Sequence, residues 1–330
     1  PARWQASDVV RIRSHGLWRN VASEVTRAQV ACRFGLETDT LRRKLVPEWR
    51  PTVPEGLDPC SIPAEVLHDY ELATSGVEFE EPEAAAAVEG SDTSRLGVGS
   101  NNWAVSPART ATGRPVLAND PHRGHAVPSL RYIAHLTAPG LDVIGAGEPA
   151  LPGVSIGHNQ RIAFGLTIFS LDQEDLYVYE THPEDPDRDR YRGDWVPFET
   201  SRAAIGIRDA PELEVTIKFT RHGPVVFEDP EQHRAFAVRA GWLEPGMAPY
   251  FGSVEYLRAQ HWREFVAALY RWGAPAEYQV YADIDGNIGY KPAGLFPLRV
   301  NVDGLLPVPG DGRFEWQGYF DMDALPEEYN

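Results

Sequence analysis

The chain has few of the features that mark several large classes of protein. It contains 2 cysteines in 330 residues, which are too few for a disulfide scaffold and lack the spacing of a metal site. Cys32 and Cys60 leave two interpretations open, one disulfide or two buried free thiols, and free thiols are the default. No apolar run approaches the roughly 18–20 residues that cross a bilayer, so we expect no membrane span.

Basic residues are also scarce relative to acidic ones. The 31 Lys and Arg face 48 Asp and Glu, which gives a formal net charge of −17. Binding to nucleic acid needs clustered positive charge, so this class of partner is excluded. What the chain does have is 42% apolar residues and 9 Trp, enough for a sizeable folded core.

Composition divides the chain into three parts. Residues 77–99 are acidic and rich in small residues, which is typical of a linker because such a stretch buries little apolar area. Residues 1–76 read as mainly helical, and residues 100–330 read as rich in β-strands. The chain begins without Met and without a signal-peptide pattern, so we expect it to be a segment of a longer protein.

Periodicity places the main elements. A helix is expected at 24–34, with Ser23 as N-cap and Gly35 at its end, and another at 261–271. The turn signal IDGN at 284–287 predicts a hairpin. Strands are expected at 103–106, 115–119, 130–136, 142–146, 162–166, 176–180, 213–220, 225–227, 234–238, 279–283 and 288–292.

The junction between Gly99 and Ser100 has the residue types needed for cleavage of the chain by its own serine. A Ser hydroxyl can attack the carbonyl before it and form an ester that water opens. The product is a chain beginning at Ser100, whose free α-amine has a pKa near ~7.7–8.0 and is a usable base. One residue then supplies nucleophile and base, a known variant of triad chemistry. By itself the Gly-Ser pair is weak evidence, because such a pair is far more often an ordinary linker end.

An ordered series of motifs downstream of Ser100 resembles the start of the β chain of penicillin and cephalosporin acylases, which share it with acyl-homoserine-lactone acylases. The motifs are SNNWAV at 100–105, RTATG at 109–113, VLANDPH at 116–122, PGLDV at 139–143, LPGV at 151–154, GHNQRIAFG at 157–165, RHGPV at 221–225, YADIDGNIGY at 281–290 and LPVPG at 306–310. The resemblance implies the N-terminal nucleophile hydrolase fold, an α+β sandwich of four layers, αββα, incomplete in this segment. It also implies α and β chains cut from one precursor and paired with each other.

The resemblance also implies roles for individual residues. Ser100 is the expected nucleophile, cleavage is expected between Gly99 and Ser100, and His122 stands where some branches place a His beside the nucleophile. The backbone N–H of Ile168 matches one oxyanion donor, and the second, an Asn, is expected beyond residue 330. Loss of one such donor costs about 2.7–4 kcal/mol of barrier, so this stretch alone is expected to be nearly inactive.

A metal site is implied at DQED, residues 172–175. The family pattern places a structural calcium on the side chains of Asp172 and Asp175, the Glu174 carbonyl and Glu24, with a loose match at the Gly304 carbonyl. The other interpretation is a solvated acidic turn. A zinc site on the histidines, which include an HxxH at 122–125, is disfavoured because the spacing is not that of a helical zinc motif. No organic cofactor is expected.

The positions that resemble the family's acyl pocket are mostly apolar, so we expect a hydrophobic acyl group on a small amide substrate. They are Trp103, Leu130, Ile156, Leu166 and Ser170, with Trp18 less securely matched. Arg123 stands where classical penicillin G acylases have an aromatic, which leaves a carboxylated acyl group open.

The preferred hypothesis is therefore an amide hydrolase of the penicillin-acylase type, exported to the periplasm or outside the cell. One alternative is a secreted, β-rich, calcium-binding module without catalysis. A second is a metal-dependent hydrolase that uses the histidines.

Overall fold

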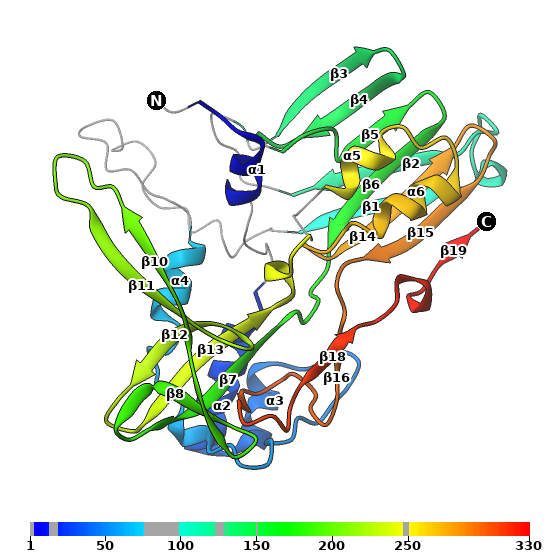
Figure 1. The fold of residues 1–330 in the computed structure, drawn as a ribbon. Helices are drawn as coiled ribbons and strands as arrows, with labels where there is room; N and C mark the ends of the chain where they lie inside the picture. Colours follow the sequence, from blue (N-terminus) through cyan, green and yellow to red (C-terminus); the bar gives the residue numbers. More distant parts are fainter. Residues whose placement is uncertain are drawn as a thin grey trace, which may run out of the picture.

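The computed structural model describes residues 3–12, 19–75, 99–122, 129, 131–149, 151–246 and 251–330. Sheets dominate, with helices at the upstream end and between strands, so the predicted α+β class is confirmed. Two large sheets lie in separate halves of the molecule (Figure 1). Of the helices in these ranges, none has the length and apolar character needed to span a membrane.

The first large sheet is antiparallel and has seven strands in the order β19-β15-β14-β6-β5-β4-β3. Two helices, α5 and α6, pack on one face of it (Figure 1). Their apolar side chains, led by Trp262 and Phe265 of α6, meet Phe164 and Leu166 of β6. The bounds are Tyr132–Ala138 (β3), Leu141–Gly147 (β4), Ile156–Asn159 (β5), Ile162–Ile168 (β6), Gly252–Tyr256 (α5), Trp262–Leu269 (α6), Glu277–Asp283 (β14), Ile288–Ala293 (β15) and Glu328–Tyr329 (β19).

A two-stranded hairpin lies against the opposite face of this sheet. It consists of β1 (Ser100–Val105) and β2 (Val116–Pro121). Neighbouring residues of a strand point to opposite faces, so Gly165 points away from the helices that Phe164 and Leu166 contact. Helices, sheet and hairpin are thus three stacked layers of the expected sandwich.

Two asparagines opposite each other in the hairpin fix it on the sheet. Asn102 Nδ2 donates to the Tyr278 carbonyl at 3.0 Å, and Asn119 Oδ1 accepts from the Leu166 N–H at 2.5 Å. The close approach requires glycine at 165, because a Cβ there would lie 2.3 Å from Asn119 Oδ1. No local signal predicts this clamp, because Asn102 and Asn119 read as ordinary strand residues.

The second large sheet has the order β10-β11-β12-β13-β7-β8-β9, with the short β17 pairing parallel to β7. Helix α2 packs on it through Val21, Val25 and Ala28, which meet Leu176 and Phe236. The strand bounds are Glu174–His182 (β7), Asp185–Tyr191 (β8), Asp194–Pro197 (β9), Glu199–Ile205 (β10), Leu213–Thr220 (β11), Gly223–Asp229 (β12), Arg234–Ala240 (β13) and Val308–Pro309 (β17). The remaining elements are α1 (Ala6–Ile12), α2 (Val21–Phe34), α3 (Asp39–Arg42), α4 (His68–Thr74), β16 (Pro297–Arg299) and β18 (Trp316–Tyr319).

The start of α2 differs from the prediction. The helix begins at Val21, so Ser23 lies inside it and the predicted N-cap is wrong. The free N–H groups of Asn20 and Val21 instead donate to the Glu174 carboxylate, at 2.8 and 3.2 Å. The capping group thus comes from β7, more than 150 residues away, where local sequence cannot reveal it. The predicted end at Gly35, which has φ 85°, is confirmed.

The default interpretation of the cysteines is also wrong. Cys32, near the end of α2, and Cys60 form a disulfide, and both residues are exposed. The bond closes a loop of residues 32–60 entirely upstream of the predicted linker.

Most predicted strands are confirmed to within about three residues, and the hairpin of β14 and β15 forms as expected. The helix predicted at 261–271 is α6, with His261 as its N-cap. Strands β5, β8, β9 and β10, and the short strands β16 to β19, were not predicted. The sequence of β8 is DPDRDRY. Because most of its side chains are charged, it lacks the alternation of apolar residues from which strands are predicted. The predicted linker at 77–99 lies almost wholly outside the described residues, and the division of the chain into three parts stays a prediction.

Replacing Gly165 with alanine tests the clamp. The new methyl group forces Asn119 away from the Leu166 N–H, and we expect a loss of about 1–3 kcal/mol of stability. Thermal melting measures it. Gly206→Ala is the matched control, because a Cβ at Gly206 has no neighbour within 4 Å among the described residues. Equal melting temperatures for the two variants would contradict the clamp.

Candidate active site and acidic cluster

The hairpin register brings Ser100 and His122 together. Ser100 pairs with Pro121 at the open end of the hairpin, so Gly99 and His122 are the next residues on either side. The His122 N–H donates to the Gly99 carbonyl at 2.9 Å, which extends the ladder by one bond. The two residues that the sequence assigned to the same site are therefore neighbours.

The Gly99 carbonyl has two donors. Besides the His122 N–H, it accepts the Ser100 hydroxyl at 2.6 Å. A backbone N–H aimed at a carbonyl oxygen stabilises the negative charge that develops there when a nucleophile adds. The Gly99 carbonyl thus has an N–H donor on one side and a hydroxyl, a group able to add to a carbonyl carbon, on the other.

The imidazole of His122 contacts two polar side chains of the hairpin. Its Nε2 lies 2.9 Å from Asp120 Oδ2 and 3.3 Å from the side-chain amide of Asn101. A carboxylate only accepts, so the Nε2 that faces Asp120 carries a proton. Nδ1 lies 3.4 Å from where a Cβ of Gly99 would stand, alongside the junction. Asp120 was not among the predicted site residues, although the ANDPH motif contains it.

Ile168, whose backbone N–H is the predicted oxyanion donor, is the last residue of β6. It pairs with Glu277, and its neighbour Thr167 pairs with Tyr278. Tyr278 is the residue whose carbonyl receives Asn102, two residues after Ser100. The start of β1, which carries Ser100, therefore lies near the end of β6, which carries Ile168. The predicted role of the Ile168 N–H as oxyanion donor requires this.

The predicted acyl-pocket positions are only partly brought together. Ile156 packs against the apolar cluster that contains Leu166. Trp103 is half exposed on β1, and Ser170 lines a cavity of about 390 Å³ beside the acidic cluster. Leu130, Trp18 and Arg123 lie outside the described residues. The pocket assignment therefore stays a prediction.

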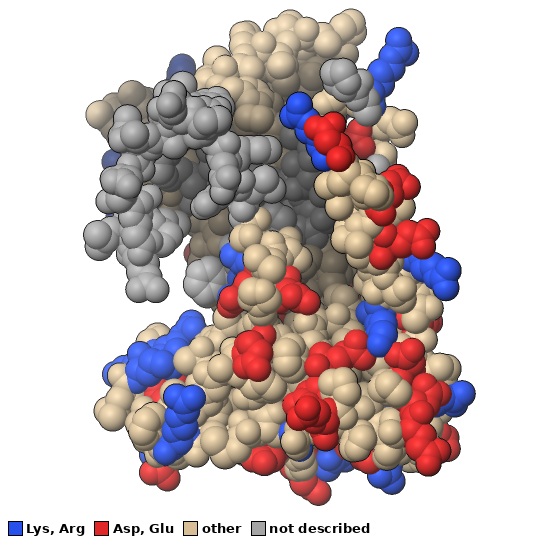
Figure 2. All heavy atoms as spheres, turned by 90° about the vertical axis from the view of Figure 1, so that its left-hand side faces the viewer, with Lys and Arg blue, Asp and Glu red and all other residues tan. Residues whose placement is uncertain are grey.

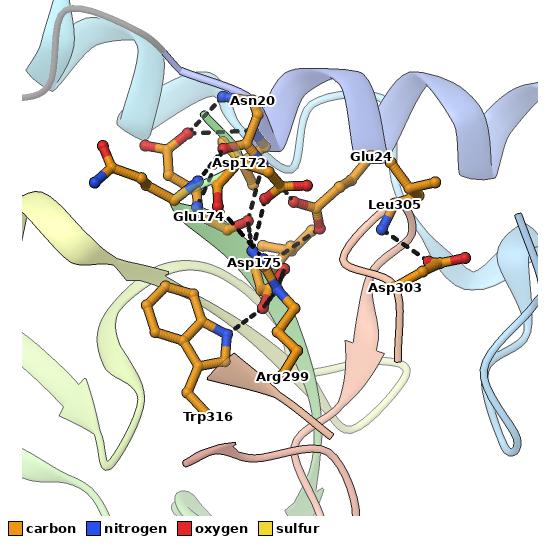
Figure 3. A network of polar contacts seen from close by, with 12 residues as sticks. Asn20, Glu24, Asp172, Glu174, Asp175, Arg299, Asp303, Leu305 and Trp316 are labelled. Atoms are coloured by element: carbon orange, nitrogen blue, oxygen red, sulfur yellow. Dashed lines mark hydrogen bonds and ion pairs between the residues drawn. The ribbon is translucent and has the colours of Figure 1, made fainter. Parts of the chain in front are cut away.

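The predicted metal-site carboxylates do converge. Oxygens of Glu24 on α2, of Asp172 in the loop before β7 and of Asp175 on β7 all lie within 4.8 Å of one another (Figure 3). Burial, and then the nearby charges of Asp175 and Asp172, raises the pKa of Glu24 well above its usual range. The Glu174 side chain points elsewhere, to the start of α2 and to Trp242 Nε1 at 2.9 Å, and only its carbonyl faces the cluster.

Arg299 of β16 reaches into this cluster. Its Nε lies 2.8 Å from Asp175 Oδ2, and one terminal nitrogen lies 2.6 Å from Asp172 Oδ1 and 3.3 Å from the Glu174 carbonyl (Figure 3). These are the donor atoms that the resemblance assigns to calcium. The residue types suit a hard cation, but a guanidinium already engages their oxygens, so a calcium ion does not fit this arrangement.

The histidines do not form a zinc site in the part of the chain that the structure covers. His135 pairs with Asp142, His158 bonds the Asn159 carbonyl, and His222 is buried between Tyr179 and Glu315. Burial lowers the pKa of His222. His125 lies outside the described residues. The only possible metal-binding group found among the described His, Cys, Asp and Glu residues is the acidic cluster.

On the face shown in Figure 2, basic side chains stand singly or in small groups among acidic ones. The described part of this face therefore offers no continuous basic surface to a polyanion.

The α+β fold of the chain is that of the N-terminal nucleophile hydrolases. The family model of penicillin amidase matches residues 1–330, and the chain belongs to that family. A solved structure, the thermostable penicillin G acylase from Alcaligenes faecalis, superposes with a TM-score of 0.61 at 32% identity, over 69% of this chain and 42% of that one. The predicted family and fold class are thereby confirmed.

Curated relatives share part of their length with the chain. Penicillin acylase 2 proenzyme from Pseudomonas sp. strain SE83 is 36% identical over 73% of the chain and 31% of the relative. Penicillin G acylase from Escherichia coli is 28% identical over 70% and 27%. Acyl-homoserine lactone acylase QuiP from Pseudomonas aeruginosa is 29% identical over 99% and 40%. The chain thus spans less than half the length of these relatives.

Proposed function

We propose that the protein is an amide hydrolase that cuts its own chain between Gly99 and Ser100 and then uses Ser100 as nucleophile. The observation that carries the proposal is the Gly99 carbonyl, which accepts the His122 N–H at 2.9 Å and the Ser100 hydroxyl at 2.6 Å. Membership of the penicillin amidase family and the similarity to a proenzyme support it.

The first step is an acyl shift. Ser100 Oγ attacks the Gly99 carbonyl carbon, and the oxygen that becomes negative is stabilised by the His122 N–H. The C–N bond breaks, the Ser100 nitrogen takes up the proton that the hydroxyl has lost, and Gly99 is left as an ester on Oγ. Water then hydrolyses the ester, which leaves a carboxylate at Gly99 and a free α-amine and hydroxyl on Ser100.

In the second reaction the free α-amine of Ser100 serves as the base. It takes the hydroxyl proton while Oγ adds to a substrate amide, and it returns that proton to the nitrogen of the leaving amine, so that the acyl group stays as an ester on Ser100. Water then attacks this ester, the α-amine takes a proton from the water, and the acid leaves as Oγ regains its proton. The Ile168 N–H, at the same sheet edge, is the proposed oxyanion donor of this site. His122, with Nε2 held by Asp120, lies beside the junction and positions the amine and hydroxyl.

The substrate class is proposed from the relatives and from the apolar character of the surroundings. Relatives are named as acylases of penicillin and of acyl-homoserine lactones, both of which carry an acyl amide on a small ring. The positions that resemble the family's acyl pocket, among them Trp103 and Ile156, are mostly apolar, which supports the proposal of a hydrophobic acyl group.

After cleavage the two chains are proposed to stay paired through side chains on both sides of the cut. Arg27 of α2, which is buried, donates to the Leu305 carbonyl. The acidic cluster joins Glu24 to β7. The alternative of a calcium-binding module without catalysis loses support, because the family is one of amidases and a guanidinium engages the proposed ligands.

We also propose that the protein works in an oxidising compartment, the periplasm or the cell exterior. The exposed disulfide between Cys32 and Cys60 supports this, because exposed disulfides do not persist in a reducing cytosol.

Replacing Ser100 with alanine tests the function. The full-length variant should remain one chain and hydrolyse no amide, because nucleophile and base are lost together. Intact mass and N-terminal sequencing of the wild type should show a new chain beginning Ser-Asn-Asn-Trp. Ser106→Ala, at the other end of β1, is the control and should process normally. A wild type that stays uncut and still hydrolyses a panel of acyl amides contradicts the proposal.

Replacing Asp120 with asparagine tests its positioning of His122. With Asp120 65% exposed at its side chain, we expect kcat/KM to fall roughly 10-fold, less than the roughly 100-fold expected when a catalytic base is lost, with a shifted pH profile. Asp142→Asn is the matched control, because Asp142 pairs with His135 at 2.6 Å on a different hairpin. If both variants leave the pH profile of kcat/KM unchanged, Asp120 has no positioning role.

A further inference from the structure

We propose that the guanidinium of Arg299 is the resident cation of the acidic cluster, and that this protein therefore needs no calcium there. The proposal concerns Glu24, Asp172 and Asp175, whose oxygens converge as they would around an ion. It does not depend on the catalytic role proposed for Ser100.

The first argument is the set of atoms that Arg299 engages. Nε donates to both oxygens of Asp175, at 3.1 and 2.8 Å. One terminal nitrogen donates to Asp172 Oδ1 at 2.6 Å and to the Glu174 carbonyl at 3.3 Å, and the other lies 3.4 Å from the Asp172 carbonyl. Two carboxylates and two carbonyls thus face one planar cation, the ligand types that calcium also takes.

The second argument is that neighbouring residues are shaped to the guanidinium. A Cβ on Gly304 would lie 2.7 Å from the Arg299 Cζ and Nε, so only glycine leaves room for the head group. Gly304 also has φ 73°, which favours glycine independently. The Gly304 position, which the resemblance loosely matches to a calcium-binding carbonyl, here forms the wall against which the guanidinium packs.

The third argument is the aromatic side of the site. The ring of Trp316 on β18 lies 5.2 Å from the Arg299 Cζ, and its Nε1 donates to Asp175 Oδ2 (Figure 3). The Arg299 side chain is 10% exposed and that of Asp175 is 1% exposed. Among the described residues, the guanidinium is therefore buried against an indole ring and bonded to two carboxylates.

The fourth argument is electrostatic. Three carboxylates at such close range need positive charge, which a divalent ion or an arginine can supply. Both cannot use the same oxygens, because a calcium ion would need the lone pairs of Asp172 and Asp175 that Arg299 engages and would repel the guanidinium. Glu24, bonded to the Leu176 N–H at 3.1 Å and to Asn20 Nδ2 at 3.1 Å, completes the cluster from α2.

The experiment compares full-length wild type with Arg299→Ala. Terbium, a calcium mimic excited through nearby Trp316, reports an ion in the cluster, and thermal melting with chelator or calcium chloride reports its effect on stability. We expect wild type to show no sensitised terbium emission, no bound calcium after purification in calcium, and the same melting temperature in either solution. Arg299→Ala should melt lower, gain terbium emission, and recover several degrees in calcium.

Arg313→Ala is the control, because Arg313 pairs with Asp311 and Glu55 at the surface and should leave the ion responses as in wild type. One equivalent of calcium in purified wild type, or a lower wild-type melting temperature in chelator, overturns the proposal. If Arg299→Ala does not fold, the wild-type calcium content and chelator response decide alone. A folded Arg299→Ala that gains no ion response also overturns it.

Discussion

Charge compensation at the contact between α2 and β7 is the interaction on which the rest of the structure depends. Glu24, Asp172 and Asp175 meet there, and Arg299 supplies the positive charge. Removing one partner of a buried ion pair typically costs about 3–5 kcal/mol, because the remaining charge is left without compensation. The same contact caps α2 through Glu174, so helix start, strand start and ion cluster form one unit.

That unit is close in sequence to the proposed active site. Only residues 169–173 separate Ile168, at the end of β6, from Glu174, at the start of β7. The Gln173 N–H donates to Asn20 Oδ1, and its side-chain amide reaches the Gly273 and Leu295 carbonyls. The strand end that carries the proposed oxyanion donor is thereby tied to α2. The hairpin clamps of Asn102 and Asn119 hold Ser100 on the other side.

What the sequence predicted well has a local signal. The apolar face of α6, the turn between β14 and β15, and the ordered motifs around Ser100 each lie within a few residues. What it missed depends on partners far along the chain. Glu174 replaces the predicted Ser23 cap, Cys60 pairs with Cys32, and Arg299 comes from a strand 124 residues beyond Asp175. An arginine reads as a surface residue by default, and only the fold brings Arg299 to the acidic cluster.

The most direct test of this account is a crystal structure of the processed full-length enzyme grown in calcium, with anomalous data. The account predicts planar guanidinium density between Asp172 and Asp175, with Glu24 nearby and no anomalous peak in the cluster. A peak surrounded by these oxygens at about 2.3–2.6 Å, with Arg299 turned away, would contradict it.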